Sequence, residues 1–189
     1  MNSVFITGIP TSGKTYLAKR LSKTTGLQYV GADSFRREMK KDPKLEKWVN
    51  HYWNLDEEKY YTETPCAEQW INLVNQSEAF WPTILSKTKD YLKYGPIIIE
   101  GVNLLPHLTA RNFDFKGVVL LGESEAGVLE KLNKEPRWGR TLKLKRLEAE
   151  AFFNCEGKHY KEEAEKYGYS PFKDFEEAEK ELLKMISGS

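Results

Sequence analysis

The sequence has few cysteines and few histidines. Its two cysteines, Cys66 and Cys155, are too few for a disulfide framework and lack the spacing of metal ligands. The three histidines lie far apart along the chain and show no ligand pattern either. We therefore expect neither a structural metal site nor a histidine-based nucleophile, and a reducing, cytoplasmic environment fits the low cysteine content.

The chain also lacks an excess of charge and any long apolar run. Lys and Arg number 29 against 28 Asp and Glu, a formal net charge of +1, so net charge does not draw the chain to nucleic acid or to a membrane. The first apolar run is too short for a signal peptide, and none approaches the ~20 residues of a membrane span. We expect a single domain over 1–189, as a monomer or homodimer.

A phosphate-binding loop motif is present near the amino terminus. Segment 8–15 reads G-x-x-x-x-G-K-T. It follows the run 4–7, which has a buried-strand pattern, and it precedes the helical spacing of Leu17, Ala18 and Leu21. The motif is therefore predicted between a strand and a helix, as its mechanism requires. The expected nucleotide-binding residues are Gly8, Ile9, Pro10, Thr11, Ser12, Gly13, Lys14 and Thr15.

The residue types of this loop suit the phosphates of a nucleoside triphosphate. Its two glycines let several backbone N–H groups converge on one anion, and the following helix adds the positive end of its dipole. Lys14 is expected to reach the β- and γ-phosphates, and the Thr15 hydroxyl is expected to bind Mg²⁺. We therefore predict ATP and Mg²⁺ as cofactors.

An acidic residue and two arginines follow the second predicted strand, 27–30. Asp33, Arg36 and Arg37 stand at the carboxyl end of that strand, the edge at which open α/β sheets bind ligands. Asp33 is expected to orient an acceptor oxygen and take its proton, and Arg36, favoured over Arg37, to bind an acceptor anion. The alternative is that Asp33 caps a helix and the arginines form its solvated face.

The segment from about 40 to 95 is predicted to be a helical insertion. Its second half is expected to hold two helices, one over 66–77 and one from about 84 to a stop at Gly95. In its first half an aromatic stripe with helical spacing is expected to pack a small cap, the alternative being a platform for a stacked substrate. The stripe consists of Trp48, Tyr52 and Trp53.

The run 96–101 is the clearest buried strand, because a continuous apolar sequence is typical of a parallel strand covered on both faces. It ends at Glu100, whose carboxylate is expected to hold Mg²⁺ or to position the acceptor. Asn103 follows in a loop beside the expected site. A strand over 117–121 and a short strand over 169–172 complete the predicted sheet.

Residues 135–146 are predicted to form a lid. Arg137 and Arg140 flank a glycine between two helices, a pattern that lets positive charge close over the transferring phosphoryl group. The alternative is surface charge on a turn between helices. The expected catalytic residues are Lys14, Asp33, Arg137 and Arg140; the expected acceptor-binding residues are Asp33, Arg36, Arg37, Glu100 and Asn103; the expected metal ligands are Thr15 and Glu100.

This order of elements resembles the small P-loop kinases, which include nucleoside monophosphate, shikimate and gluconate kinases. Within that group the P-loop, segment 32–38 and segment 98–106 look like those of 2-phosphoglycerate kinases. The resemblance implies a three-layer α/β fold, with a parallel five-stranded sheet, helices on both faces, a helical acceptor-binding insertion and a lid. That family usually carries a histidine where this chain has Asn103.

The sequence thus predicts an ATP- and Mg²⁺-dependent kinase that acts on a small metabolite hydroxyl or phosphate, with a phosphoglycerate-like acid as one candidate. A nucleoside or nucleoside monophosphate kinase is the first alternative, with the base stacked on Trp48, Trp53 or Trp70. A non-catalytic ATP-binding regulatory module is the second, although such a module needs no paired acidic and arginine positions. A nucleic-acid kinase is disfavoured because the chain has no continuous basic stripe.

Overall fold

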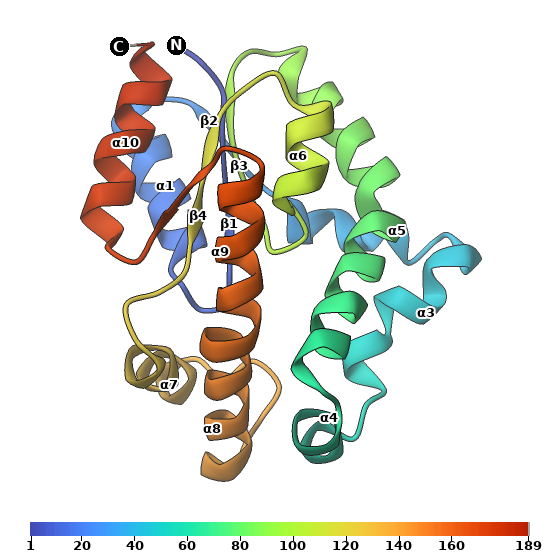
Figure 1. The fold of residues 1–189 in the computed structure, drawn as a ribbon. Coiled ribbons are helices and arrows are strands. Elements are labelled where there is room, and N and C mark those ends of the chain that lie inside the picture. Colours follow the sequence, from blue (N-terminus) through green and yellow to red (C-terminus); the bar gives the residue numbers. More distant parts are fainter. Residues whose placement is uncertain (189) are drawn as a thin grey trace.

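The computed structural model describes residues 1–188, and in it a parallel sheet is covered by helices on both faces (Figure 1). The sheet has five strands in the order β2-β3-β1-β4-β5. The strands are β1 (Val4–Gly8), β2 (Gln28–Gly31), β3 (Ile97–Glu100), β4 (Gly117–Leu120) and β5 (Ser170–Phe172). All neighbouring pairs are parallel, so the predicted fold class is confirmed.

Alternation along the strands sends side chains into two hydrophobic cores. On one face, Val4 and Ile6 of β1 pack with α1 (Lys14–Thr25) and α10 (Phe175–Ser187). On the other face, Phe5 packs with the cluster formed by α5 (Cys66–Leu92), α6 (Pro106–Asn112) and α9 (Gly157–Lys166). Figure 1 shows α1 and α10 on the left of the sheet and α5 and α6 on the right. The strands are apolar on both faces because both faces are covered.

The remaining helices gather at the carboxyl edge of the sheet and in the segment between β2 and β3. They are α2 (Arg36–Met39), α3 (Glu46–Val49), α4 (Glu57–Glu63), α7 (Glu125–Lys134) and α8 (Leu142–Glu150). A π-helical segment, Ala151–Glu156, joins α8 to α9 without a break. The parallel register places Gly31 of β2 and Ile6 of β1 opposite Glu100 of β3, so β2 and β3 end side by side and β1 continues two residues further to Gly8.

Helix α5 corrects the prediction of two separate helices over 66–77 and 84–95. It runs unbroken from Cys66 to Leu92, with Pro82 inside it. Phe80, Trp81 and Ile84 around the proline are buried in the core, and this burial outweighs the loss of one backbone hydrogen bond. None of the described helices, α5 included, is long and apolar enough to cross a membrane.

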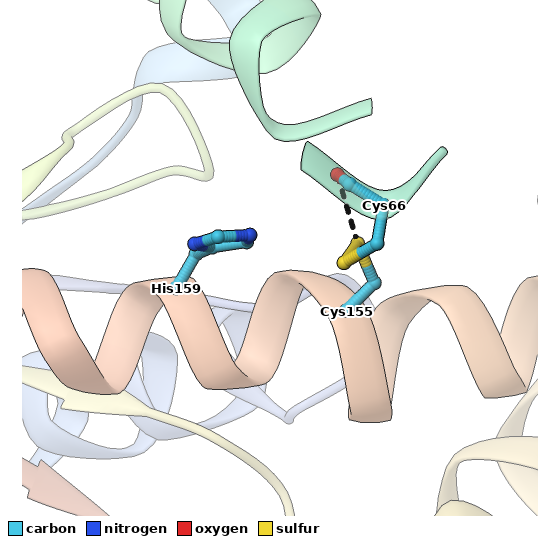
Figure 2. A group of neighbouring side chains, drawn as sticks. All are labelled: Cys66, Cys155 and His159. Carbon is cyan, nitrogen blue, oxygen red and sulfur yellow. Dashed lines mark hydrogen bonds between the residues drawn. A yellow bond between two sulfur atoms is a disulfide. The ribbon is translucent and has the colours of Figure 1, made fainter. Parts of the chain in front are cut away.

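The two cysteines also differ from expectation. Cys66, at the start of α5, and Cys155, in the π-helical segment, are joined by a disulfide across 89 positions of sequence (Figure 2). The sequence shows too few cysteines for a framework, yet the fold brings this one pair together. The cross-link fastens the insertion to the helix that follows the predicted lid.

Candidate active site

The loop between β1 and α1 has the backbone geometry of an anion cradle. Gly8 has φ of +127°, and a Cβ there would lie 1.9 Å from the carbonyl oxygen of Leu120. Gly13, at the N-cap of α1, has φ of +99°. Thr11 has φ of 60°, a conformation that costs free energy in a β-branched residue. Such strain concentrates at ligand-binding sites, and here it falls within the predicted phosphate-binding motif.

Lys14 is buried inside this loop. Its Nζ donates a hydrogen bond to the carbonyl oxygen of Ile9 at 2.5 Å. Burial lowers the pKa of Lys14 to about 8, and the negative charge of Glu100 opposes that shift. The ammonium group is therefore held inside the loop, where a phosphate oxygen would be a stronger acceptor than the carbonyl it now contacts.

Thr15 and Glu100 lie together at the carboxyl end of β3. The Thr15 hydroxyl donates to Oε1 of Glu100 at 3.1 Å, and the Tyr29 hydroxyl donates to the same oxygen at 2.8 Å. Burial, and then the charge of Glu100, raises the pKa of Tyr29, so this phenol stays a donor. One hydroxyl and one carboxylate are hard oxygen ligands of the kind that Mg²⁺ takes beside substrate phosphates, so the donor set fits the ion.

The Glu100→Gln variant is therefore expected to raise the Mg²⁺ concentration needed for half-maximal nucleotide binding by about tenfold or more, because it removes the only charge of the donor pair. Tyr29→Phe is the matched control, since it deletes a hydrogen bond to the same oxygen and keeps the carboxylate. Titration of Mg²⁺ at fixed ATP measures both. An unchanged Mg²⁺ requirement in Glu100→Gln would contradict this assignment.

A cavity of about 220 Å³ adjoins the loop and collects side chains from distant parts of the sequence. Its polar and charged lining consists of Asp33, Arg36, Gln76, Arg137 and Glu156. Its apolar and aromatic lining consists of Pro10, Tyr52, Trp53, Leu73, Val102 and Trp138. Three predicted site residues, one acidic and two basic, thus share one cavity with a residue of the phosphate loop.

The two arginines after β2 occupy different environments. Arg36 is half-buried, its Nη1 donates to the carbonyl oxygen of Val49 at 3.0 Å, and its guanidinium lies over the ring of Phe80. Burial lowers the pKa of Arg36, while the charge of nearby Asp33 raises it. Arg37 is exposed and lies outside the described cavity lining. Of the two predicted anion ligands, the structure brings Arg36 alone to the cavity.

The other two arginines both lie in the segment between α7 and α8, and they too occupy different environments. Arg137 lines the cavity, whereas Arg140 is exposed and lies outside the described lining. The backbone between them is fixed, because Oε1 of Glu148 accepts hydrogen bonds from the N–H groups of Trp138, at 3.3 Å, and Gly139, at 3.2 Å. In this structure only one predicted lid arginine faces the cavity.

Asn103 takes a position that its prediction as an acceptor ligand did not foresee. It is buried, and its amide donates to Ser77 at 2.9 Å and to Gln76 at 3.3 Å, both on α5. Gln76 in turn donates to the carbonyl oxygen of Trp48 at 2.8 Å and lines the cavity. Asn103 therefore holds the side chain of Gln76 in place, and it is Gln76 that faces the cavity.

Glu156 is the charged cavity residue that sequence reasoning missed. It is half-buried at the end of the π-helical segment, a type of helix that is common at functional sites. Burial raises the pKa of Glu156 to about 7, and the charges of Arg137 and Lys14 partly offset that rise. The signal in the sequence was an acidic residue that follows Cys155 and lies within four positions of the apolar pair Phe152 and Phe153.

A carboxyl pair lies beneath the segment that carries Arg137. Burial raises the pKa of Glu57, on α4, to about 7, and a hydrogen bond with Glu148 together with its charge adds to the shift. An added Cβ at Gly139 would lie 3.1 Å from Glu57 and 3.2 Å from Glu148, so both carboxyl groups approach the same glycine. When it is protonated, Glu57 can donate a hydrogen bond to Glu148 and so link α4 to α8.

This pair predicts a pH dependence of stability. Because the folded protein holds the Glu57 proton more tightly than the unfolded chain, the stabilisation is present at low pH and is lost as pH rises through about 7. We expect the free energy of unfolding to fall by about 1–2 kcal/mol between pH 5 and pH 8, after allowance for solvent screening. Urea unfolding at several pH values measures it. Glu57→Gln should reduce the slope and leave the part that Glu156 contributes, because burial raises the pKa of Glu156 in the same direction. Exposed Glu63→Gln should keep the full slope, and equal slopes in both variants would contradict this interpretation.

Comparison with known proteins agrees with this architecture. A family model described as an AAA domain matches residues 4–184. A gluconokinase from Sinorhizobium meliloti 1021 has a TM-score of 0.53 and 14% identity, covering 99% of this chain and 92% of its own. A sugar kinase from Janibacter sp. HTCC2649 has a TM-score of 0.52 and 17% identity, covering 99% and 95%. No curated protein matches the sequence. The likeness shows that this chain shares its fold with these proteins.

Proposed function

The chain belongs to the AAA domain family, whose model matches residues 4–184, and we propose that it is an ATP- and Mg²⁺-dependent kinase of a small molecule. The observation that supports the proposal best is the cavity beside the phosphate loop. It presents a carboxylate, Asp33, and two guanidinium groups, Arg36 and Arg137, next to the buried ammonium group of Lys14. A module that only bound ATP would have no use for this second set of charges.

In the proposed reaction an acceptor oxygen attacks the γ-phosphorus of ATP, and the bond to the oxygen bridging the β- and γ-phosphates breaks. Asp33 orients the acceptor and takes its proton. Lys14 and the loop N–H groups hold the phosphates, while Arg137 neutralises charge on the transferring group. Mg²⁺, held by Thr15 and Glu100, would supply further neutralisation of the phosphates. Because the transition state is loose, positioning and charge contribute more than the strength of the base.

The charges of the cavity favour an anionic acceptor. Arg36 is anchored by its bond to Val49, so its remaining N–H groups are pre-oriented for a carboxylate or phosphate. A sugar acid or a phosphoglycerate-like acid fits this pairing of arginine with Asp33. A cavity of about 220 Å³ is small, and a compact acid suits its size.

The aromatic wall favours a second candidate, a nucleoside or nucleoside monophosphate. Trp53 and Tyr52 from the insertion and Trp138 from the predicted lid line the cavity, and Tyr52 stacks on Trp138 with ring centroids 5.2 Å apart. Such surfaces bind planar bases by stacking. Of the three tryptophans suggested by sequence for this role, only Trp53 belongs to the described cavity lining.

A panel of acceptors separates these candidates. ATP consumption is measured with gluconate, other sugar acids and phosphoglycerates, and with nucleosides and their monophosphates. If the acceptor is an acid, Arg36→Gln should raise the KM for the acceptor about tenfold or more, and Trp53→Leu should leave it near the wild-type value. If the acceptor is a nucleoside, Trp53→Leu should raise that KM and Arg36→Gln should leave it near the wild-type value. If no acceptor stimulates ATP turnover, and a protein co-purifies with the nucleotide-bound form, the regulatory-module interpretation replaces the kinase.

A further inference from the structure

The disulfide lies within a larger set of metal-ligating groups. Ligand atoms of Cys66, Cys155 and His159 all lie within 4.8 Å of one another. Figure 2 shows the His159 imidazole on the same side of the helix as Cys155, with a ring nitrogen toward the two sulfur atoms. Cys155 and His159 are four residues apart on one continuous helix, the spacing at which two side chains share a face.

The facing helix presents a matching pair. Cys66 and Trp70 are also four residues apart, on the first turns of α5. Cys66 therefore pairs with Cys155, and one turn further along both helices Trp70 contacts His159. The Trp70 and His159 rings stack with centroids 5.2 Å apart and an interplanar angle of 16°. Packing against Trp70 therefore fixes the orientation of the imidazole beside the sulfur atoms, and this contact does not depend on the bond between the cysteines.

A carboxylate completes the surroundings of the histidine. Nδ1 of His159 lies 3.6 Å from Oε2 of Glu162, one turn further along α9. Metal-bound histidines commonly have such a partner at the ring nitrogen that does not bind the metal, because it fixes the orientation and tautomer of the ring. His159 is half-buried and Cys66 is exposed, so the cluster is open to solvent on one side.

We propose that the reduced form of this cluster is a zinc site formed by Cys66, Cys155 and His159. Two thiolates and one imidazole are preferred Zn²⁺ ligands, with bonds of about 2.3 Å to sulfur and about 2.0 Å to nitrogen, and water takes the fourth position. A reductant delivers two electrons and two protons to the disulfide and yields two thiols. Zn²⁺ then displaces both thiol protons, so binding releases acid.

The site has two forms with the same structural consequence. When oxidised, a covalent bond fastens the start of α5 to the π-helical segment; when reduced, a zinc ion does so. Cys155 directly precedes Glu156, which lines the cavity, so either form fixes the cavity wall on that side. The spacing between Cys66 and Cys155 hides this arrangement in the sequence.

The test is a metal titration of the full chain, with Zn²⁺ alone and with Co²⁺ as a spectroscopic substitute. The protein is reduced with a phosphine, which leaves no competing thiol, and Zn²⁺ affinity is measured by competition with a chromophoric chelator. We expect the reduced wild type to bind one Zn²⁺ per chain and the oxidised wild type to bind none at this cluster. The Co²⁺ form should show thiolate-to-metal charge-transfer absorption.

His159→Phe is the decisive variant, because phenylalanine preserves the stack on Trp70 and removes both ring nitrogens. We expect its reduced form to bind Zn²⁺ about 100-fold more weakly, as should Cys155→Ser. His51→Phe, an aromatic-packed histidine outside the cluster, is the matched control and should bind like the wild type. Thermal melting without metal shows whether each variant is folded. Absence of a charge-transfer band in the reduced wild type, or equal affinity in folded His159→Phe, would overturn the proposal.

Discussion

Replacing Arg137 by alanine is expected to lower kcat about 10³-fold, the effect of removing an arginine that stabilises the transferring phosphoryl group. Arg137 lines the cavity, and its charge acts on both Lys14 and Glu156. Because this charge is needed most in the transition state, the loss should fall on kcat more than on KM. Steady-state kinetics with the acceptor found by the panel measures it.

Two variants sharpen this prediction. Arg137→Lys keeps the charge but loses the planar fork, so it should restore only part of the rate. Arg140→Ala is the control within the same segment; because Arg140 is exposed outside the described lining, its rate should stay near that of the wild type. If Arg140→Ala loses more activity than Arg137→Ala, the segment closes further than the structure shows, and the catalytic arginine is Arg140.

Replacing Lys14 by alanine is expected to lower kcat/KM by about 10³-fold and to weaken ATP binding, because the variant loses the one cation buried in the phosphate cradle. Lys23→Ala removes an exposed lysine near the other end of the same helix and should have little effect. Phosphate release with a saturating acceptor and calorimetric ATP binding measure the two quantities.

The pH dependence of ATP binding tests the charge state of Lys14 independently. Its pKa is about 8 in the free protein, so it is charged below that pH and neutral above it. Bound phosphates favour the charged form, and ATP affinity should therefore fall as pH rises above about 8, by up to tenfold per pH unit. The Lys14→Ala variant should lack this fall. A wild-type affinity that is constant from pH 7 to pH 9.5 would contradict the lowered pKa.

The features that sequence predicted well are those set by local chemistry. The G-x-x-x-x-G-K-T motif, flanked by a strand and a helix, located the loop because its backbone geometry requires glycine at the two positions where φ is +127° and +99°. The continuous apolar run before Glu100 predicted β3, because such a run of β-branched residues is typical of a strand covered on both faces. Both inferences depend on neighbouring residues alone.

The features that sequence missed depend on contacts between distant residues. Nothing local shows that Cys66 meets Cys155, or that Asn103 is used to hold Gln76. No local pattern marks Glu156, because its burial in the cavity wall raises its pKa, and that burial comes from packing between distant segments. Sequence alone does not distinguish the two lid arginines. Glu148 accepts hydrogen bonds from the backbone between them, and in this conformation Arg137 faces the cavity.

In the proposed enzyme, the loop at the start of α1 holds the phosphates of ATP beside an acceptor cavity. Isothermal titration calorimetry of the wild type with MgATP tests it most directly, with Lys14→Ala titrated in parallel. We expect saturable binding of one nucleotide per chain in the wild type and much weaker binding in the variant. A wild-type titration without heat or saturation, or equal affinity in the two proteins, would contradict it.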